Sequence, residues 1–175
     1  MRTGAPLFMM VMVAATLMGT MRLPTPRAAI EGPARVIDGD TLVIGGWHTR
    51  ILGIDAPELD QTCHASTGQT WACGRDARQA LAARVGRRQV SCRVAGQDRY
   101  GRALARCATG GTDLAGWLVR EGWAIPAGNE QKRYRAASQK ARANGAGMWR
   151  GSFIRPADWR RAGDPQRKKG AVHER

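Results

Sequence analysis

Two short acidic motifs supply oxygen atoms of the kind that bind a hard metal cation. Asp38 and Asp40 flank a glycine at a sharp bend, and Asp55 and Glu58 stand around the rigid Pro57. Ca²⁺ takes several oxygen ligands, and carboxylates from two neighbouring strand ends can provide them. Asp-Gly is also an ordinary turn pair, so a turn explains any one of these acids equally well. Four acids gathered in a chain with only 14 Asp+Glu against 28 Lys+Arg favour a metal site.

Two arginines have positions suited to binding phosphate. Arg50 lies inside an apolar, β-branched stretch, where a charge is costly unless it is paired. Arg102 ends a polar turn. Guanidinium groups bind phosphate through two parallel hydrogen bonds and stabilise charge that develops on it. In the alternative interpretation, Arg50 is the buried partner of Asp55 or Glu58, and Arg102 is one more surface charge.

The elements that must position these residues are short strands followed by interleaved helices. The expected strands cover 35–44, with a bend in the middle, 47–54, 89–95 and 103–108. The expected helices cover 76–85, 113–121 and 130–144, each followed by a glycine. Residues 59–74 are polar and are expected to form a loop. Because no βαβ rhythm is present, the pattern predicts an α+β barrel rather than a doubly wound sheet.

The charge of the chain points to a polyanionic partner. The net charge is +14 and the isoelectric point is about 11.2. A fold does not need this excess, but a protein that approaches nucleic acid gains encounter rate from a positive field. A basic solvated surface is the alternative, and charge alone does not separate the two.

The N-terminus predicts export. Arg2 precedes an apolar run over 5–18, which is shorter than the roughly 20 residues of a membrane-spanning helix and suits a secretory signal. We expect cleavage near Ala28 or Ala29, with an uncleaved membrane anchor as the alternative, and a periplasmic or extracellular location. The expected organisation is a signal peptide or anchor over 1–29, one domain over 30–160 and a basic disordered tail over 161–175.

The four cysteines agree with export, because disulfides persist in oxidising compartments. Four cysteines allow three pairings. If the hairpin is centred between Arg99 and Tyr100, Cys92 lies directly opposite Cys107, within disulfide reach. Cys63 and Cys73 then pair by elimination. Four buried free thiols are the alternative.

Three ordered motifs together resemble the staphylococcal nuclease (thermonuclease) family, over residues 33 to 160. The motifs are Val36-Ile37-Asp38-Gly39-Asp40-Thr41-Leu42, Arg50 followed by Asp55-Ala56-Pro57-Glu58, and Asp98-Arg99-Tyr100-Gly101-Arg102-Ala103-Leu104-Ala105. The closing segments Gly147-Met148-Trp149 and Phe153-x-x-Pro156-x-x-Trp159-Arg160 resemble bacterial members. The resemblance implies a small five-stranded OB-fold β-barrel with about three helices. It also implies Ca²⁺-dependent hydrolysis of DNA and RNA that leaves 3′-phosphates.

The resemblance also implies a role for each site residue. It makes Asp40 and Asp55 calcium carboxylates, Ala56 a backbone-carbonyl ligand, Glu58 the general base, Arg50 and Arg102 the phosphate-binding pair, and Tyr100 with its neighbour Arg99 substrate contacts. The segment 123–134 departs from the tyrosine-rich stretch of the type enzyme, so no base preference is inferred. The alternative function is a non-catalytic OB-fold module that only binds nucleic acid. Pure binding would not require Glu58, both acids and both arginines, so we favour the enzyme. We also expect a monomer.

Overall fold

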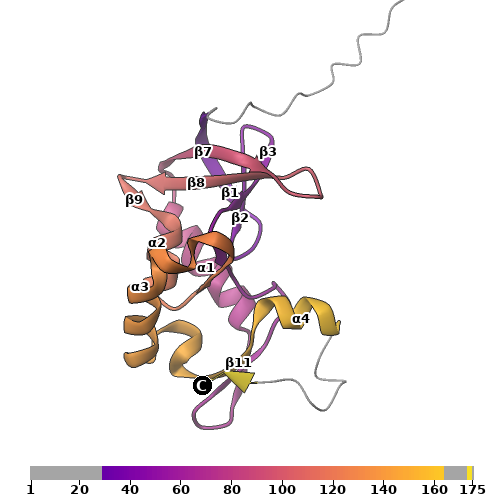
Figure 1. Cartoon of the computed structure of the whole chain (residues 1–175), viewed down its shortest axis with the longest axis vertical. Helices are drawn as coiled ribbons and strands as arrows, with labels where there is room; N and C mark the ends of the chain where they lie inside the picture. The colour runs from indigo at the N-terminus through magenta and orange to yellow at the C-terminus, as the bar shows by residue number, and fades with distance from the viewer. Residues whose placement is uncertain (1–28, 164–172, 175) are drawn as a thin grey trace, which may run out of the picture.

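The computed structural model describes residues 29–163 and 173–174 (Figure 1). The expected signal peptide or anchor, up to residue 28, and residues 164–172 and 175 of the expected tail lie outside the described residues. Within the described ranges, no helix is both long and apolar enough to cross a membrane.

Five strands close into a barrel that carries the candidate site at one end. They are β1 (Ala29–Val36), β2 (Thr41–Ile44), β3 (Trp47–Ile51), β7 (Gln89–Gln97) and β8 (Ala103–Thr109). Their order is β3-β2-β1-β7-β8, and a parallel pairing of β3 with β8 closes the barrel. Alternate residues face inward, as Val90, Cys92 and Val94 do along β7. The predicted α+β fold with an OB-type five-stranded barrel is confirmed.

Glycines set the turns between the first strands. Gly45 and Gly46 connect β2 to β3 with φ angles of 55° and 84°, which are the left-handed values that a two-residue hairpin turn requires. The strand expected over 47–54 ends at Ile51, and Gly53, with φ of 90°, lies in the turn that follows. The last part of that stretch is the separate β4 (Ile54–Asp55), which pairs with β10 (Ile125–Pro126).

The β7–β8 hairpin has the predicted register. Cys92 lies directly opposite Cys107, with 4.0 Å between their Cα atoms, and the two form a disulfide. A bulge between Val94 and Gly96 shifts the pairing by one residue near the turn. The second predicted disulfide, Cys63–Cys73, is also present, so the described residues contain no free cysteine.

Replacing Cys92 and Cys107 together by alanine should lower the free energy of unfolding by about 3 kcal/mol. The two cysteines are 15 residues apart, and a cross-link of this length removes that much chain entropy from the unfolded state. Denaturant titration of the purified variant and the parent measures the difference. If the two midpoints coincide, the bond contributes nothing and the prediction is wrong.

The described residues contain four α-helices, one more than expected. They are α1 (Cys73–Val85), α2 (Leu114–Arg120), α3 (Gln131–Ala143) and α4 (Pro156–Ala162), with 3₁₀ turns η1 (Gly128–Glu130) and η2 (Gly147–Arg150). The helix α4 begins with Pro156, whose fixed φ suits a first helical position, and it has only 7 residues. A segment this short and this basic shows no helical periodicity, so the sequence does not indicate this helix. In Figure 1, α4 lies across the molecule from α2 and α3.

The segment 59–74 was expected to form a loop, but it also contains regular structure. It contains β5 (Cys63–Ala65) and β6 (Thr70–Trp71), which form a small sheet with β11 (Gly151–Ile154) and β12 (His173–Glu174). The remaining strand, β9 (Thr112–Asp113), extends the barrel sheet beside β8. Besides the main hydrophobic core of the barrel and its helices, a smaller hydrophobic cluster lies beside the small sheet. It consists of Cys63, Cys73, Ile125, Met148 and Phe153. These contacts are distant in sequence, so the local pattern did not indicate them.

Candidate active site

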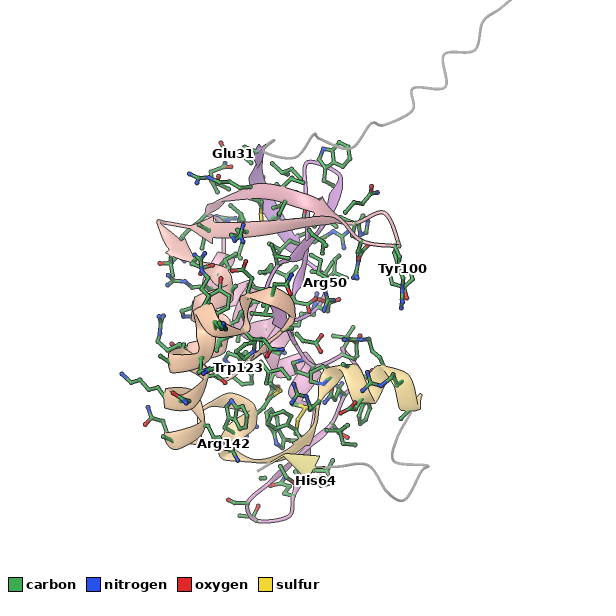
Figure 2. All side chains as sticks on the ribbon, viewed as in Figure 1. Glu31, Arg50, His64, Tyr100, Trp123 and Arg142 are labelled. Atoms are coloured by element: carbon green, nitrogen blue, oxygen red, sulfur yellow. A yellow bond between two sulfur atoms is a disulfide. The ribbon has the colours of Figure 1, made fainter. Side chains whose placement is uncertain are left out.

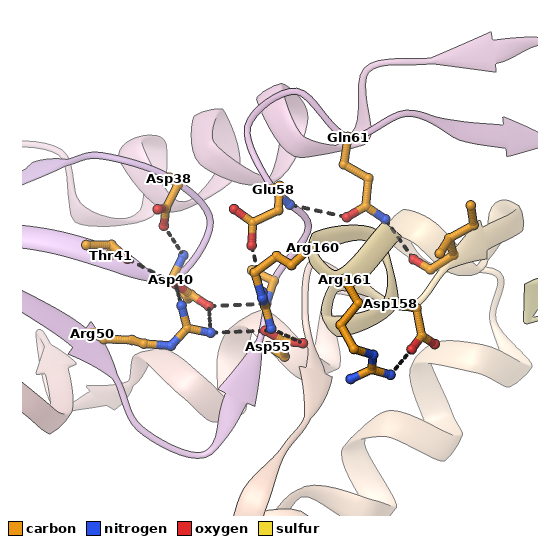
Figure 3. A network of polar contacts seen from close by, with 12 residues as sticks. Asp38, Asp40, Thr41, Arg50, Asp55, Glu58, Gln61, Asp158, Arg160 and Arg161 are labelled. Carbon is orange, nitrogen blue, oxygen red and sulfur yellow. Dashed lines mark hydrogen bonds and ion pairs between the residues drawn. The ribbon is translucent and has the colours of Figure 1, made fainter. Parts of the chain in front are cut away.

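A partly buried ion pair joins the bend after β1 to strand β3. Thr41 pairs with Arg50 in the β2–β3 ladder, so the preceding Asp40 lies beside the arginine side chain. Arg50 Nη1 donates to Asp40 Oδ1 over 2.9 Å, and Nη2 lies 2.7 Å from Oδ2 (Figure 3). The guanidinium therefore binds the carboxylate through both nitrogens, which is the strongest form of such a pair.

Asp40 is held in a setting that makes its charge costly. The residue is only 3% exposed, and burial raises the pKa of Asp40 to about 7, against the opposing effect of Arg50. Its oxygens accept hydrogen bonds from the Ala56 backbone N–H, over 3.3 Å, and from the Thr41 hydroxyl, over 3.0 Å. A nearby cation therefore stabilises the charged form of this carboxylate.

Asp55 and Glu58 share a second arginine. Arg50 Nη2 donates to Asp55 Oδ1 over 3.0 Å, and Arg160 Nη2 lies 2.9 Å from the same oxygen. Arg160 Nη1 lies 2.6 Å from Glu58 Oε1 (Figure 3). Arg50 is thus an ion-pair partner of Asp55, as the alternative interpretation held, and it still lines the cavity described below.

The polar turn between β7 and β8 is organised by Asp98. Its Oδ1 accepts the backbone N–H groups of Tyr100, over 2.9 Å, and Arg102, over 3.0 Å, while Oδ2 accepts Arg102 Nε over 2.7 Å. Arg102 Nη1 reaches the Thr41 hydroxyl at 3.5 Å, which ties the turn to the β2 end. Tyr100 is 69% exposed, and Arg99 Nη2 donates to its hydroxyl over 2.6 Å. Figure 2 shows Tyr100 at the tip of this turn, while Trp123 and Arg142 lie among the helices.

Asp98→Asn should destabilise the protein at neutral pH, and by less at acidic pH. Burial alone would raise the pKa of Asp98, but its hydrogen bonds to Arg102 and Tyr100 outweigh burial and lower it. A carboxylate with a lowered folded-state pKa stabilises the fold above its unfolded pKa of about 3.9, and this contribution is lost as the pH falls through the folded value. Urea titrations at pH 7 and near pH 3 measure the gap between variant and parent. A gap of equal size at both pH values contradicts the prediction.

One cavity collects most of the predicted catalytic and substrate-binding residues. Its volume is about 670 Å³, and it is lined by Asp38, Arg50, Glu58, Asp98, Arg99, Tyr100, Arg102, Leu104 and Arg160. A second cavity of about 680 Å³ adjoins it and shares Arg50, Leu104 and Arg160. Asp55 lines the second cavity, whereas Asp40 and Ala56 are buried beside it. The catalytic residues predicted from the sequence therefore meet in one place.

The predicted metal ligands have suitable donor atoms, although they do not form a large cluster. Among the described residues, no group of three or more His, Cys, Asp or Glu side chains is arranged to hold a metal ion. Asp40 and Asp55 do approach each other, because an oxygen of each lies within 3.0 Å of Arg50 Nη2. Two carboxylates with backbone carbonyls and water make the hard-oxygen set that Ca²⁺ prefers, so the donor chemistry fits that ion.

Two site residues were not predicted from the sequence. Arg160 contacts both Asp55 and Glu58, yet in the sequence it was only part of a terminal motif with no assigned role. Gln61 is fully buried, accepts the Glu58 backbone N–H over 3.2 Å and donates to the Ile154 carbonyl over 2.7 Å. It connects the loop that carries Glu58 to the strand before α4. A glutamine in a polar stretch gives no sequence signal of this role.

Comparison with known proteins places these features in a family. Residues 48–151, more than half of the chain, match the family of staphylococcal nuclease homologues. The chain is 40% identical over 124 residues to the succinoglycan biosynthesis protein ExoI of Rhizobium meliloti (strain 1021), which covers 69% of this chain and 65% of ExoI, less than two thirds of that relative.

Two further relatives are more distant. An uncharacterized endonuclease of Haemophilus influenzae is 30% identical over 135 residues, which covers 73% of this chain and 70% of the relative. Protein ParB of Escherichia coli is 32% identical over 157 residues, which covers 78% of this chain and 81% of the relative. The barrel, the motif order and these matches agree, and the chain belongs to the staphylococcal nuclease family.

Proposed function

We propose that this protein is a Ca²⁺-dependent nuclease that hydrolyses phosphodiester bonds of DNA and RNA with little sequence specificity. The observation that carries the proposal is the meeting of Arg50, Arg102 and Glu58 at one cavity. Two arginines and a carboxylate that line one open cavity suit a phosphodiester and an attacking water. The endonuclease of Haemophilus influenzae among the relatives supports the same reaction class.

Each of these side chains has a role that its position supports. Glu58 is 33% exposed at the side chain, so water can reach it, and it orients or deprotonates the nucleophile. Arg50 and Arg102 bind the non-bridging phosphate oxygens and stabilise the charge of the pentacoordinate state. Tyr100 and Arg99, on the exposed turn, contact the neighbouring nucleotide. Such contacts address the phosphate and the sugar-base stack rather than base edges, so little specificity is expected.

The candidate metal ligands are Asp40, Asp55 and the backbone carbonyl of Ala56. A Ca²⁺ ion held there would act as a Lewis acid on a phosphate oxygen. The protein contributes a buried pair of carboxylates kept in place by Arg50 and, at Asp40, by the Ala56 N–H and the Thr41 hydroxyl. These contacts keep the oxygen donors in position without a metal, and a Ca²⁺ ion between the two carboxylates would require the Arg50 guanidinium to shift away from them.

We also propose that the protein is a monomer that works outside the cytoplasm. Disulfides Cys63–Cys73 and Cys92–Cys107 favour an oxidising compartment, as does the apolar run that follows Arg2.

The deciding experiment is a cleavage assay with the purified chain, supercoiled plasmid and single-stranded RNA in millimolar Ca²⁺. We expect nicked and then linear plasmid, shortened RNA and 3′-phosphate ends. The competing function is a nucleic-acid-binding module without catalysis. A protein that retards plasmid and RNA in a gel but leaves both intact would establish that alternative instead.

A further inference from the structure

Arg160 occupies a central position in the site although it lies outside the matched family region, residues 48–151. It comes from α4, the helix that the sequence did not indicate. Its guanidinium contacts Glu58 at 2.6 Å and Asp55 at 2.9 Å, and it lines both adjoining cavities. The next residue, Arg161, instead pairs with Asp158 within the helix and points away from the cluster (Figure 3). The two neighbouring arginines thus have quite different surroundings.

The carboxylates do not use all the hydrogen-bonding capacity of Arg160. A guanidinium has five N–H donors, and here one nitrogen faces Glu58 while another faces Asp55. Its side chain is 39% exposed, so part of it remains open to the cavity. A phosphate oxygen in that cavity can therefore accept a hydrogen bond from Arg160 while the ion pair with Glu58 persists.

The charges of the residues that line the cavity favour phosphate binding by Arg160. The acidic lining residues are Asp38, Glu58 and Asp98, and the basic ones are Arg50, Arg99, Arg102 and Arg160. Removing Arg160 leaves as many acids as bases in the lining. A guanidinium stays charged throughout the neutral range, so this positive charge at the cavity is permanent.

We propose that Arg160 is a third phosphate-binding arginine, which holds Glu58 in place and at the same time binds the phosphate of the nucleic acid. The inference rests on the proposed nuclease function. It extends the site beyond the matched family region, residues 48–151, to the C-terminal helix, which closes one side of the cavity with a positive charge. A lysine cannot replace it fully, because an ammonium group is a single point charge without the planar fork.

The test compares Arg160→Gln, Arg160→Lys and the control Arg161→Gln in the full chain. Binding of a fluorescent single-stranded oligonucleotide is measured in chelator at several salt concentrations, and cleavage is measured separately in Ca²⁺. Arg160→Gln should weaken binding about tenfold or more, the effect of one lost charge-assisted contact. It should also make the slope of log affinity against log salt shallower by about 0.7, the effect of one lost phosphate contact. Arg161→Gln should match the parent in both measurements.

Arg160→Lys should recover most of the salt slope but not the full cleavage rate. The inference would be overturned if Arg160→Gln bound the oligonucleotide as Arg161→Gln does. It would also be overturned if Arg160→Gln cleaved faster than the parent, because Arg160 would then only block access to the carboxylates. Full recovery of cleavage by lysine would also overturn it. A parent protein that neither binds nor cleaves nucleic acid would instead refute the proposed function. Melting temperatures separate a lost contact from a lost fold, and Arg160→Lys provides the comparison if Arg160→Gln is unstable.

Discussion

Glu58→Gln should reduce the rate of nucleic-acid cleavage by on the order of 10²-fold or more, the usual effect of losing a general base. Glutamine has nearly the same shape and can still accept a hydrogen bond from Arg160, so the site should keep its geometry. It cannot take a proton from water. Single-turnover cleavage of an oligonucleotide, with enzyme in excess, measures the chemical step directly, and oligonucleotide affinity should change far less than the rate.

Asp158→Asn is the matched control for this change. It makes the same carboxylate-to-amide substitution on an acid that pairs with Arg161 on α4 rather than with the cavity arginines. We expect the control to retain the cleavage rate of the parent. If Glu58→Gln lowers binding and cleavage by the same factor, Glu58 is not a base, and the binding-module interpretation gains support.

The local parts of this structure could be predicted from the sequence because short-range rules determine them. Gly45 and Gly46 supply the positive φ values of a hairpin turn, and the symmetric spacing about Arg99 and Tyr100 places Cys92 opposite Cys107. The acids and arginines of the three motifs could be singled out because they stand near strand ends and turns, and the structure places them close together, whereas their catalytic roles stay predictions. In these cases the residues that interact are close together in the sequence.

The remaining parts depend on contacts between distant segments. Gln61 meets the Ile154 carbonyl 93 residues further along the chain, and Arg160 meets Glu58 across 102 residues. The strand β5 pairs with β11 on one side and with β6 on the other, and the Cys63–Cys73 disulfide closes the segment that contains both β5 and β6. No periodicity within 59–74 or 156–162 indicates such partners. Tertiary packing therefore overrides local pattern in the two segments that complete the site.

Removing divalent cations should abolish cleavage while leaving the fold and much of the nucleic-acid affinity intact. Asp40 and Asp55 present hard oxygen donors next to a cavity lined by arginines, and the described residues offer no thiolate or histidine cluster that would favour another metal. Activity in excess chelator should fall to background and return when Ca²⁺ is added in the millimolar range. The ion pairs with Arg50 connect β3 to both acids without a metal, so the melting temperature should change little.

The oligonucleotide affinity in chelator shows whether the loss of cleavage reflects the missing metal or a disrupted site. Guanidinium groups can bind phosphate without a metal, and four arginines line the cavity, so we expect binding to persist when cleavage stops. Loss of both together would mean that chelation disrupts the site itself. Full cleavage in chelator would exclude a metal from the reaction, and Glu58 with the arginines would then have to account for the whole rate. Because a phosphodiester must be polarised as water attacks it, and guanidinium groups alone provide only hydrogen bonds and charge, we expect the metal to be required.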